Sequence, residues 1–104
     1  MFYRTALDVK TPSAQYTAVF DFAQDLAVGE TISSASTAAT VYSGTDASPS
    51  SVISGASVAS GKQVKQLTVG GVLGVTYYIV CTATTSLGQV LTRSGYLVIV
   101  PTTV

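Results

Sequence analysis

Val75–Thr85 reads VTYYIVCTATT and has the clearest period of any segment in the chain. Its apolar residues alternate, so that Tyr77 and Ile79 share one face of an extended segment while Tyr78 and Val80 share the other. Alternation with a period of two is typical of a β-strand with one buried face. We therefore predict a strand whose core-facing residues are Val75, Tyr77, Ile79, Cys81 and Ala83.

Other segments on both sides of this strand have strand character. A hairpin turn at Thr85–Gln89 contains Gly88, which suits the left-handed conformation of such turns. The remaining predicted strands are Tyr16–Phe22, Glu30–Tyr42, Ser51–Ser60, Gln63–Val69 and Val90–Val100, which Pro101 stops. The apolar residues of the second of these change parity, which indicates a bulge or two short strands.

The fold class follows from the number and spacing of these strands. About seven short strands with turn residues between them indicate an all-β, immunoglobulin-like β-sandwich. A barrel of the OB type is the alternative, although its five longer strands fit the turns less well. Tyr77 and Tyr78 follow the glycine-rich corner Gly70–Gly74, where immunoglobulin-like domains often carry a corner tyrosine. Because Tyr77 shares the parity of Cys81, we expect Tyr77 in the core and Tyr78 at the surface or an interface.

The sandwich pattern begins only at Tyr16, so we expect residues 16–104 to form the domain and residues 1–15 an extended N-terminal arm. The arm is too apolar for a solvated tail and is long enough to add a strand to a neighbouring subunit. The alternative is that it folds back as a first strand of its own domain. The predicted protein-interaction residues are Met1, Phe2, Tyr3, Arg4, Leu7 and Val9.

The composition excludes most kinds of active site. The chain has 104 residues and no His, a single Cys, and five basic against five acidic residues. It therefore cannot build within one chain the usual zinc, haem or iron–sulfur ligand sets, or a triad with a histidine base. We expect no catalytic residue, no metal, no cofactor, no nucleic-acid partner and no membrane span. Asp21, Asp25 and Glu30 match no calcium loop, and Asp21 suits the cap of a short helical turn.

The surface is rich in hydroxyl groups and poor in charge. The chain has 13 Ser and 15 Thr, charged residues make up 10%, and the net charge is zero. A net charge near zero favours association. We therefore expect a protein that belongs to an assembly of many copies.

Several motifs resemble those of small tailed-bacteriophage virion proteins with an immunoglobulin-like fold, described as phage fibre–tail adaptors. In the first half these are a Lys-x-Pro sequence, an aromatic strand and a Leu-Ala-x-Gly-Glu-Thr-Ile sequence, at Lys10–Pro12, Tyr16–Phe22 and Leu26–Ile32. In the second half they are a glycine-rich corner before a tyrosine strand and a Thr-Thr-Ser-x-Gly hairpin, at Val69–Tyr77 and Ala83–Gln89.

The resemblance implies a structural part of a phage virion, made in the host cytoplasm, that joins the tail to its fibres or spikes without catalysis. Its partners would be other virion proteins in a symmetric assembly. A capsid decoration or cement protein is the first alternative, and copy number per particle separates the two. A glycan-binding module is the second alternative, although the chain has no Trp for a sugar platform.

Overall fold

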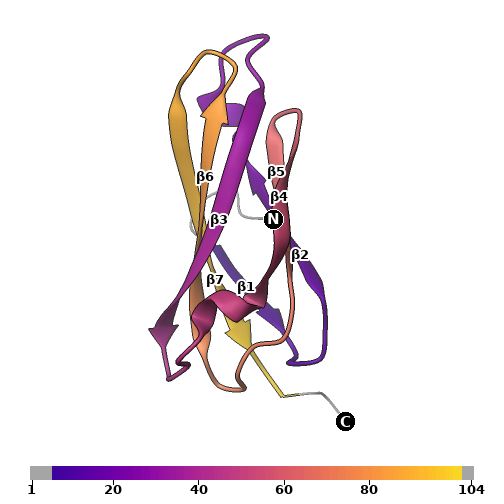
Figure 1. Cartoon of the computed structure of the whole chain (residues 1–104), viewed down its shortest axis with the longest axis vertical. Helices are drawn as coiled ribbons and strands as arrows, with labels where there is room; N and C mark the ends of the chain where they lie inside the picture. The colour runs from indigo at the N-terminus through magenta and orange to yellow at the C-terminus, as the bar shows by residue number, and fades with distance from the viewer. Residues whose placement is uncertain (1–5, 102–104) are drawn as a thin grey trace.

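The computed structural model describes residues 6–101 and shows an all-β fold (Figure 1). Its strands are β1 (Ala6–Lys10), β2 (Tyr16–Asp21), β3 (Ile32–Ser43), β4 (Ile53–Ser60), β5 (Gln63–Thr68), β6 (Thr76–Thr85) and β7 (Val90–Ile99). Two short 3-10 helices, η1 (Ala23–Asp25) and η2 (Pro49–Val52), interrupt the loops. Within residues 6–101, no helix has the length and apolar character needed to cross a membrane.

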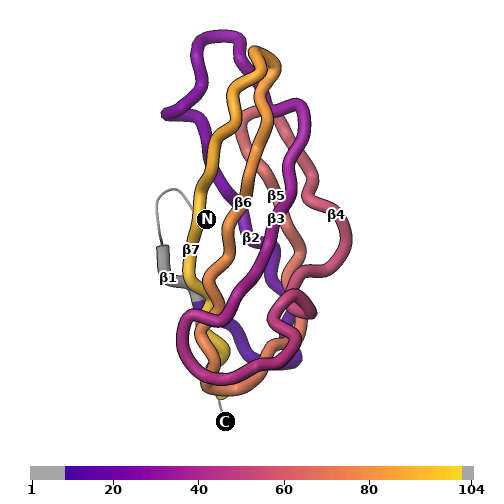
Figure 2. The backbone as a smooth tube through the Cα atoms, turned by 60° about the vertical axis from the view of Figure 1, so that its left-hand side comes forward, coloured from indigo at the N-terminus to yellow at the C-terminus, as the bar shows by residue number. Residues whose placement is uncertain are grey.

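The strands form two sheets that pack face to face (Figures 1 and 2). The larger sheet has the order β1-β7-β6-β3 and the smaller has the order β2-β5-β4. In the immunoglobulin fold the second, fifth and fourth strands form one sheet, and the third, sixth and seventh form the other. The predicted immunoglobulin-like β-sandwich is therefore confirmed.

The first strand lies within the segment that the sequence analysis assigns to the arm. Ala6–Lys10 pairs in parallel with β7, so that Ala6 is opposite Gly95 and Lys10 is opposite Ile99. The physical reason is that the edge of β7 offers backbone partners to an extended segment. Residues 6–10 thus add to the sheet of their own domain, and residues 1–5 lie outside the described part of the chain.

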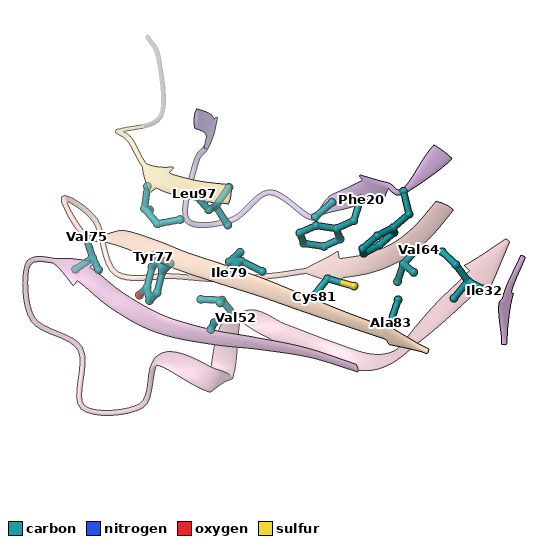
Figure 3. Close-up of a cluster of buried hydrophobic side chains, with 14 residues drawn as sticks. Phe20, Ile32, Val52, Val64, Val75, Tyr77, Ile79, Cys81, Ala83 and Leu97 are labelled. Carbon is teal, nitrogen blue, oxygen red and sulfur yellow. The ribbon is translucent and has the colours of Figure 1, made fainter. Parts of the chain in front are cut away.

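The core lies between the sheets and has the face that the alternation of β6 predicts (Figure 3). Tyr77, Ile79, Cys81 and Ala83 are fully buried, whereas Tyr78 on the opposite face is only partly buried. The other buried apolar side chains are Ala18, Phe20, Phe22, Ile32, Ala39, Val52, Val64, Val75, Leu97 and Ile99. Burial of this apolar surface is the main favourable contribution to folding.

The smaller sheet buries polar side chains that the sequence analysis does not single out. In β5, Gln66 and Thr68 are buried whereas Leu67 is 36% exposed. The Gln66 side-chain amide donates to the Ser54 carbonyl oxygen at 3.0 Å, and its Oε1 accepts from the Ser57 hydroxyl at 2.8 Å. These bonds satisfy the buried amide where the register of β4 shifts between Ser54 and Val58.

The long strand β3 contains two register shifts. They lie between Ile32 and Ser34 and between Val41 and Ser43, in the pairing of β3 with β6. A bulge changes which parity faces the core. The parity change in Glu30–Tyr42 is thus explained by a bulge within a single strand.

The Tyr77 side chain forms hydrogen bonds with two loops at one end of the sandwich, the loop after β3 and the loop after β5. Its hydroxyl donates to the Asp46 carboxylate at 2.6 Å and accepts from the Val72 amide at 2.9 Å. The second of these bonds closes the corner Gly70–Gly74, where Gly71 has φ of +104° and its Cα lies against Ile99. An added Cβ at Gly71 would lie 2.6 Å from Ile99 Cδ1, so the corner requires glycine there.

Candidate assembly interface

The outer face of the larger sheet lacks charge along its three long strands. In register, Tyr78 of β6 is opposite Tyr96 of β7 and Thr40 of β3, and Val80 is opposite Ser94 and Ala38. Paired residues share a face, so these side chains all belong to the outer surface. The remaining outward positions of the paired segments are Ser, Thr or Val. This face is therefore neutral and presents mainly hydroxyl, aromatic and small aliphatic groups.

Three tyrosines from three different strands gather on this face, and we call them the tyrosine cluster: Tyr42, Tyr78 and Tyr96. The ring centroids of Tyr42 and Tyr96 are 4.7 Å apart in an edge-on arrangement, and those of Tyr78 and Tyr96 are 5.3 Å apart. Such contacts hold the rings in fixed positions and contribute about 0.5–1.5 kcal/mol per pair. Tyr42 is 66% exposed, so the cluster offers an aromatic surface to a partner.

The predicted interaction residues lie beside this cluster where the structure describes them. Leu7 is opposite Tyr96 in the register of β1 with β7, and Val9 is opposite Val98. The Val9 side chain is 60% exposed. Met1, Phe2, Tyr3 and Arg4 lie outside the described residues.

A small hollow of about 130 Å³ adjoins the cluster and is lined by Tyr78, Val80, Thr92, Arg93 and Ser94. The Arg93 guanidinium forms an ion pair with Asp25 at 2.7 Å, which links β7 to the loop that follows β2. Because Asp25 pairs with Arg93, the charged residue of the lining, the hollow adds little net charge to the face.

Two of the motifs that carry the resemblance, Leu26–Ile32 and Ala83–Gln89, meet at one end of the domain, which we call the apex. It consists of the loop 22–31 and the turn 86–89, which lie side by side at one end of the sandwich (Figures 1 and 2). The Glu30 carboxylate accepts hydrogen bonds from the Thr85 hydroxyl at 2.5 Å and from the Ala27 amide at 2.8 Å. Ser86 bonds to the Thr31 backbone through its own amide and its hydroxyl, at 2.7 and 3.1 Å. The hydrogen bonds of Glu30 with Thr85 and of Thr31 with Ser86, which we call the clasp, therefore join the two motifs.

The Lys-x-Pro motif also has a structural role. Lys10 is buried, and its Nζ donates to the carbonyl oxygens of Thr11 and Ala14 at 2.7 and 2.8 Å. Burial lowers the pKa of this amine from its ordinary value. The lysine thus fixes the turn between β1 and β2.

None of these groups forms a reactive or metal-binding constellation. Within residues 6–101, no three His, Cys, Asp or Glu side chains gather in a way that could hold a metal ion. Cys81 is buried in the core, and burial raises the pKa of its thiol to about 11, against a hydrogen bond with Thr37 that lowers it. A neutral thiol without access to solvent is a core group.

Comparison with known protein families gives one match that spans most of the chain. Residues 10–98 match the family of the podophage GP4 fiber-tail adaptor protein gp77. The chain belongs to this family. It is accordingly a structural adaptor of the phage virion, and the family implies binding to tail and fibre proteins. No curated protein sequence matches the chain.

The tyrosine cluster of this adaptor is a feature that the sequence analysis finds only in part. Tyr78 is expected at the surface from its parity, and the structure confirms this position. Tyr42 and Tyr96 are missed, although Tyr96 directly precedes the core residue Leu97 and must therefore point outward. Register between strands, which the sequence does not show, is what brings the three rings together.

Proposed function

We propose that this adaptor contacts one of its two partners, the tail or the fibre, through the tyrosine cluster and the adjoining N-terminal segment. The observation that supports this proposal is a neutral sheet face with an exposed aromatic cluster that spans β3, β6 and β7. Tyrosine is enriched at the energetic centres of protein interfaces, and charged residues are depleted there. Leu7 and Val9 extend this interface along β1. We infer that the other predicted residues, Met1, Phe2, Tyr3 and Arg4, which lie outside the described part of the chain, also belong to it.

We further propose that the adaptor works in several copies around the tail axis and carries no catalytic activity. The neutral, hydroxyl-rich surface supports an assembled state, because low net charge favours association. Head-to-tail contacts between identical subunits generate a closed ring when the rotation between neighbours closes on itself. A capsid decoration protein would occur in far more copies per particle, so quantitative analysis of purified virions separates the two roles.

The interface is tested with the double variant Tyr42→Ser/Tyr96→Ser, called the face variant. The matched control is Val58→Ser, which changes an exposed valine on β4 of the opposite sheet. We expect the face variant to bind one of the two partners, purified tails or purified fibre protein, about tenfold or more weakly than the control does. Equal binding of both variants to both partners would refute this interface.

A further inference from the structure

The apex of the sandwich carries a second exposed apolar surface, at a distance from the tyrosine cluster along the long axis. Val28 is fully exposed, Leu87 is 67% exposed and Val90 is 66% exposed. Val28 belongs to the loop 22–31, Leu87 to the turn 86–89, and Val90 is the first residue of β7. Figure 1 shows these segments at the end of the domain opposite the loop that joins β5 to β6.

The backbone that presents these side chains is held firmly. The clasp of Glu30 with Thr85 and of Thr31 with Ser86 joins the two loops. At the base of the longer loop, the Phe22 amide donates to the Lys62 carbonyl oxygen and the Ile32 amide to that of Gly61, each at 3.0 Å. A binding loop that is already ordered loses less conformational entropy on association. The exposed side chains of Val28 and Leu87 therefore belong to loops that are already ordered before a partner binds.

The charges of the apex are neutralised or buried. The loop 22–31 contains two acidic residues, of which Asp25 pairs with Arg93 and Glu30 is buried. The segment 85–90 contains no charged residue. The turn between β4 and β5 lies next to the loop 22–31, and its exposed Lys62 is the charge that remains beside the apex. Such a surface matches an uncharged apolar pocket and has neither the basic cluster nor the aromatic residues that hold a loop at a lipid headgroup region.

We propose that the apex is a second docking surface, which inserts Val28 and Leu87 into an uncharged, apolar pocket of a virion protein. This inference rests on the proposed function, in which the tyrosine cluster contacts one partner of the adaptor. A protein that joins two others needs two separate contact surfaces. The apex supplies the second, so that tail and fibre bind different regions of the same sandwich.

The test uses the full chain with Val28→Ser/Leu87→Ser, called the tip variant. The matched control is Val58→Ser/Leu67→Ser, which makes the same two chemical changes at exposed positions of the smaller sheet. The binding partners are tails purified from a phage in which the gene for this chain is inactive, and separately the purified fibre protein. Thermal melts first establish that both variants fold.

We expect the tip variant to lose about tenfold or more of its affinity for one partner and to keep its affinity for the other. The face variant should show the reverse pattern. A tip variant that binds both partners as its control does would overturn the apex proposal. A face variant that binds both partners normally would instead refute the proposed function. The apex proposal would still be tested, because the tip variant is measured against its own control. Sedimentation of the wild-type chain, but not the tip variant, with phosphatidylglycerol vesicles would overturn the protein pocket in favour of a lipid surface.

Discussion

The Glu30 carboxylate and the Thr85 hydroxyl lie 2.5 Å apart, although 55 residues separate them in the chain. The same Thr85 oxygen accepts a hydrogen bond from the Gln89 amide at 3.1 Å, so it connects the carboxylate to the turn before β7. Hydrogen bonds to a charged acceptor are stronger than those between neutral groups. The two sequence motifs that contain Glu30 and Thr85 therefore act together to hold the two loops of the apex in place.

Replacing the clasp should loosen the apex without unfolding the sandwich. In Glu30→Gln the carboxylate that accepts from Thr85 and Ala27 is lost, and in Thr85→Val the hydroxyl is lost. We expect faster amide hydrogen exchange in residues 22–31 and 86–89 and unchanged exchange in β6. Thr84→Val is the control, because Thr84 faces outward and is only partly buried. Unchanged exchange in both apical segments would show that the clasp does not order them.

The clasp also predicts how stability depends on pH. The hydrogen bond from Thr85, and then that from the Ala27 amide, holds the pKa of Glu30 below its ordinary value of 4.5, although burial acts to raise it. A carboxyl group with a lowered folded-state pKa stabilises the protein fully above its unfolded-state pKa, and this contribution is lost as the pH falls through the folded-state pKa. Urea melts should therefore show stability falling below about pH 4.5 in the wild type and falling less in Glu30→Gln.

Asp46 adds a second acid-sensitive contribution that must be separated from the first. Its pKa is lowered from 3.8 by the hydrogen bond from Tyr77 and then by that from the Ser48 amide. Asp46→Asn should flatten the loss of stability only below about pH 3.8, whereas Glu30→Gln acts from higher pH. A wild-type profile that stays flat down to pH 3 would contradict both assignments.

The inward face of β6 makes a direct prediction about stability. Ile79 is fully buried between the sheets, and Val80 beside it is only partly buried on the outer face. Ile79→Ala should lower the free energy of unfolding by about 2–5 kcal/mol, because it removes buried methyl groups and leaves a cavity. Val80→Ala should cost clearly less in the same urea melts. Equal losses in the two variants would mean that the strand has no single buried face.

The fold was accessible from the sequence because its strands obey simple patterning. Tyr77, Ile79 and Cys81 alternate with partly buried positions on the outer face, and Gly88 marks the hairpin with φ of +83°. Local chemistry of this kind decides which segments become strands and which become turns.

The surface features depend on the pairing of strands that are far apart in the sequence, so the sequence alone predicts few of them. The tyrosine cluster exists because Tyr78 is in register with Tyr96 while a bulge places Tyr42 beside them. Similarly, the sequence places Glu30 in an acidic group and in a motif of the resemblance, but its structural role depends on the distant Thr85. A strand at β1 is only the alternative prediction for the arm, because five residues with little alternation carry no strong strand signal and the pairing with β7 decides their conformation.

Cys81 should be inert in the native protein. Burial raises the pKa of its thiol from 9.0 to about 11, which lowers the thiolate fraction about a hundredfold near neutral pH. A thiol reagent should label the folded chain far more slowly than the chain in denaturant, as mass spectrometry can follow. Rapid labelling under native conditions would show that the core opens at β6, since Cys81 has no exposed surface in the closed fold.

Truncation of the N-terminus separates the structural part of the arm from the part that we propose binds a partner. Deletion of residues 1–14 removes β1 together with Lys10, and so removes the strand that pairs with Gly95–Ile99 of β7. Deletion of residues 1–5 leaves both in place. We therefore expect the longer truncation to lower the melting temperature clearly and the shorter one to leave it near the wild-type value.

The shorter truncation is the informative one for assembly. If Met1, Phe2, Tyr3 and Arg4 extend the interface of the tyrosine cluster, the chain without residues 1–5 should fold normally but bind the partner of that face more weakly. It should bind the partner of the apex as the wild type does. Deletion of residues 102–104 is the control for shortening the chain at the other end. Unchanged binding after loss of residues 1–5 would exclude Met1, Phe2, Tyr3 and Arg4 and confine the proposed interface to Leu7, Val9 and the tyrosine cluster, which the shorter truncation leaves in place.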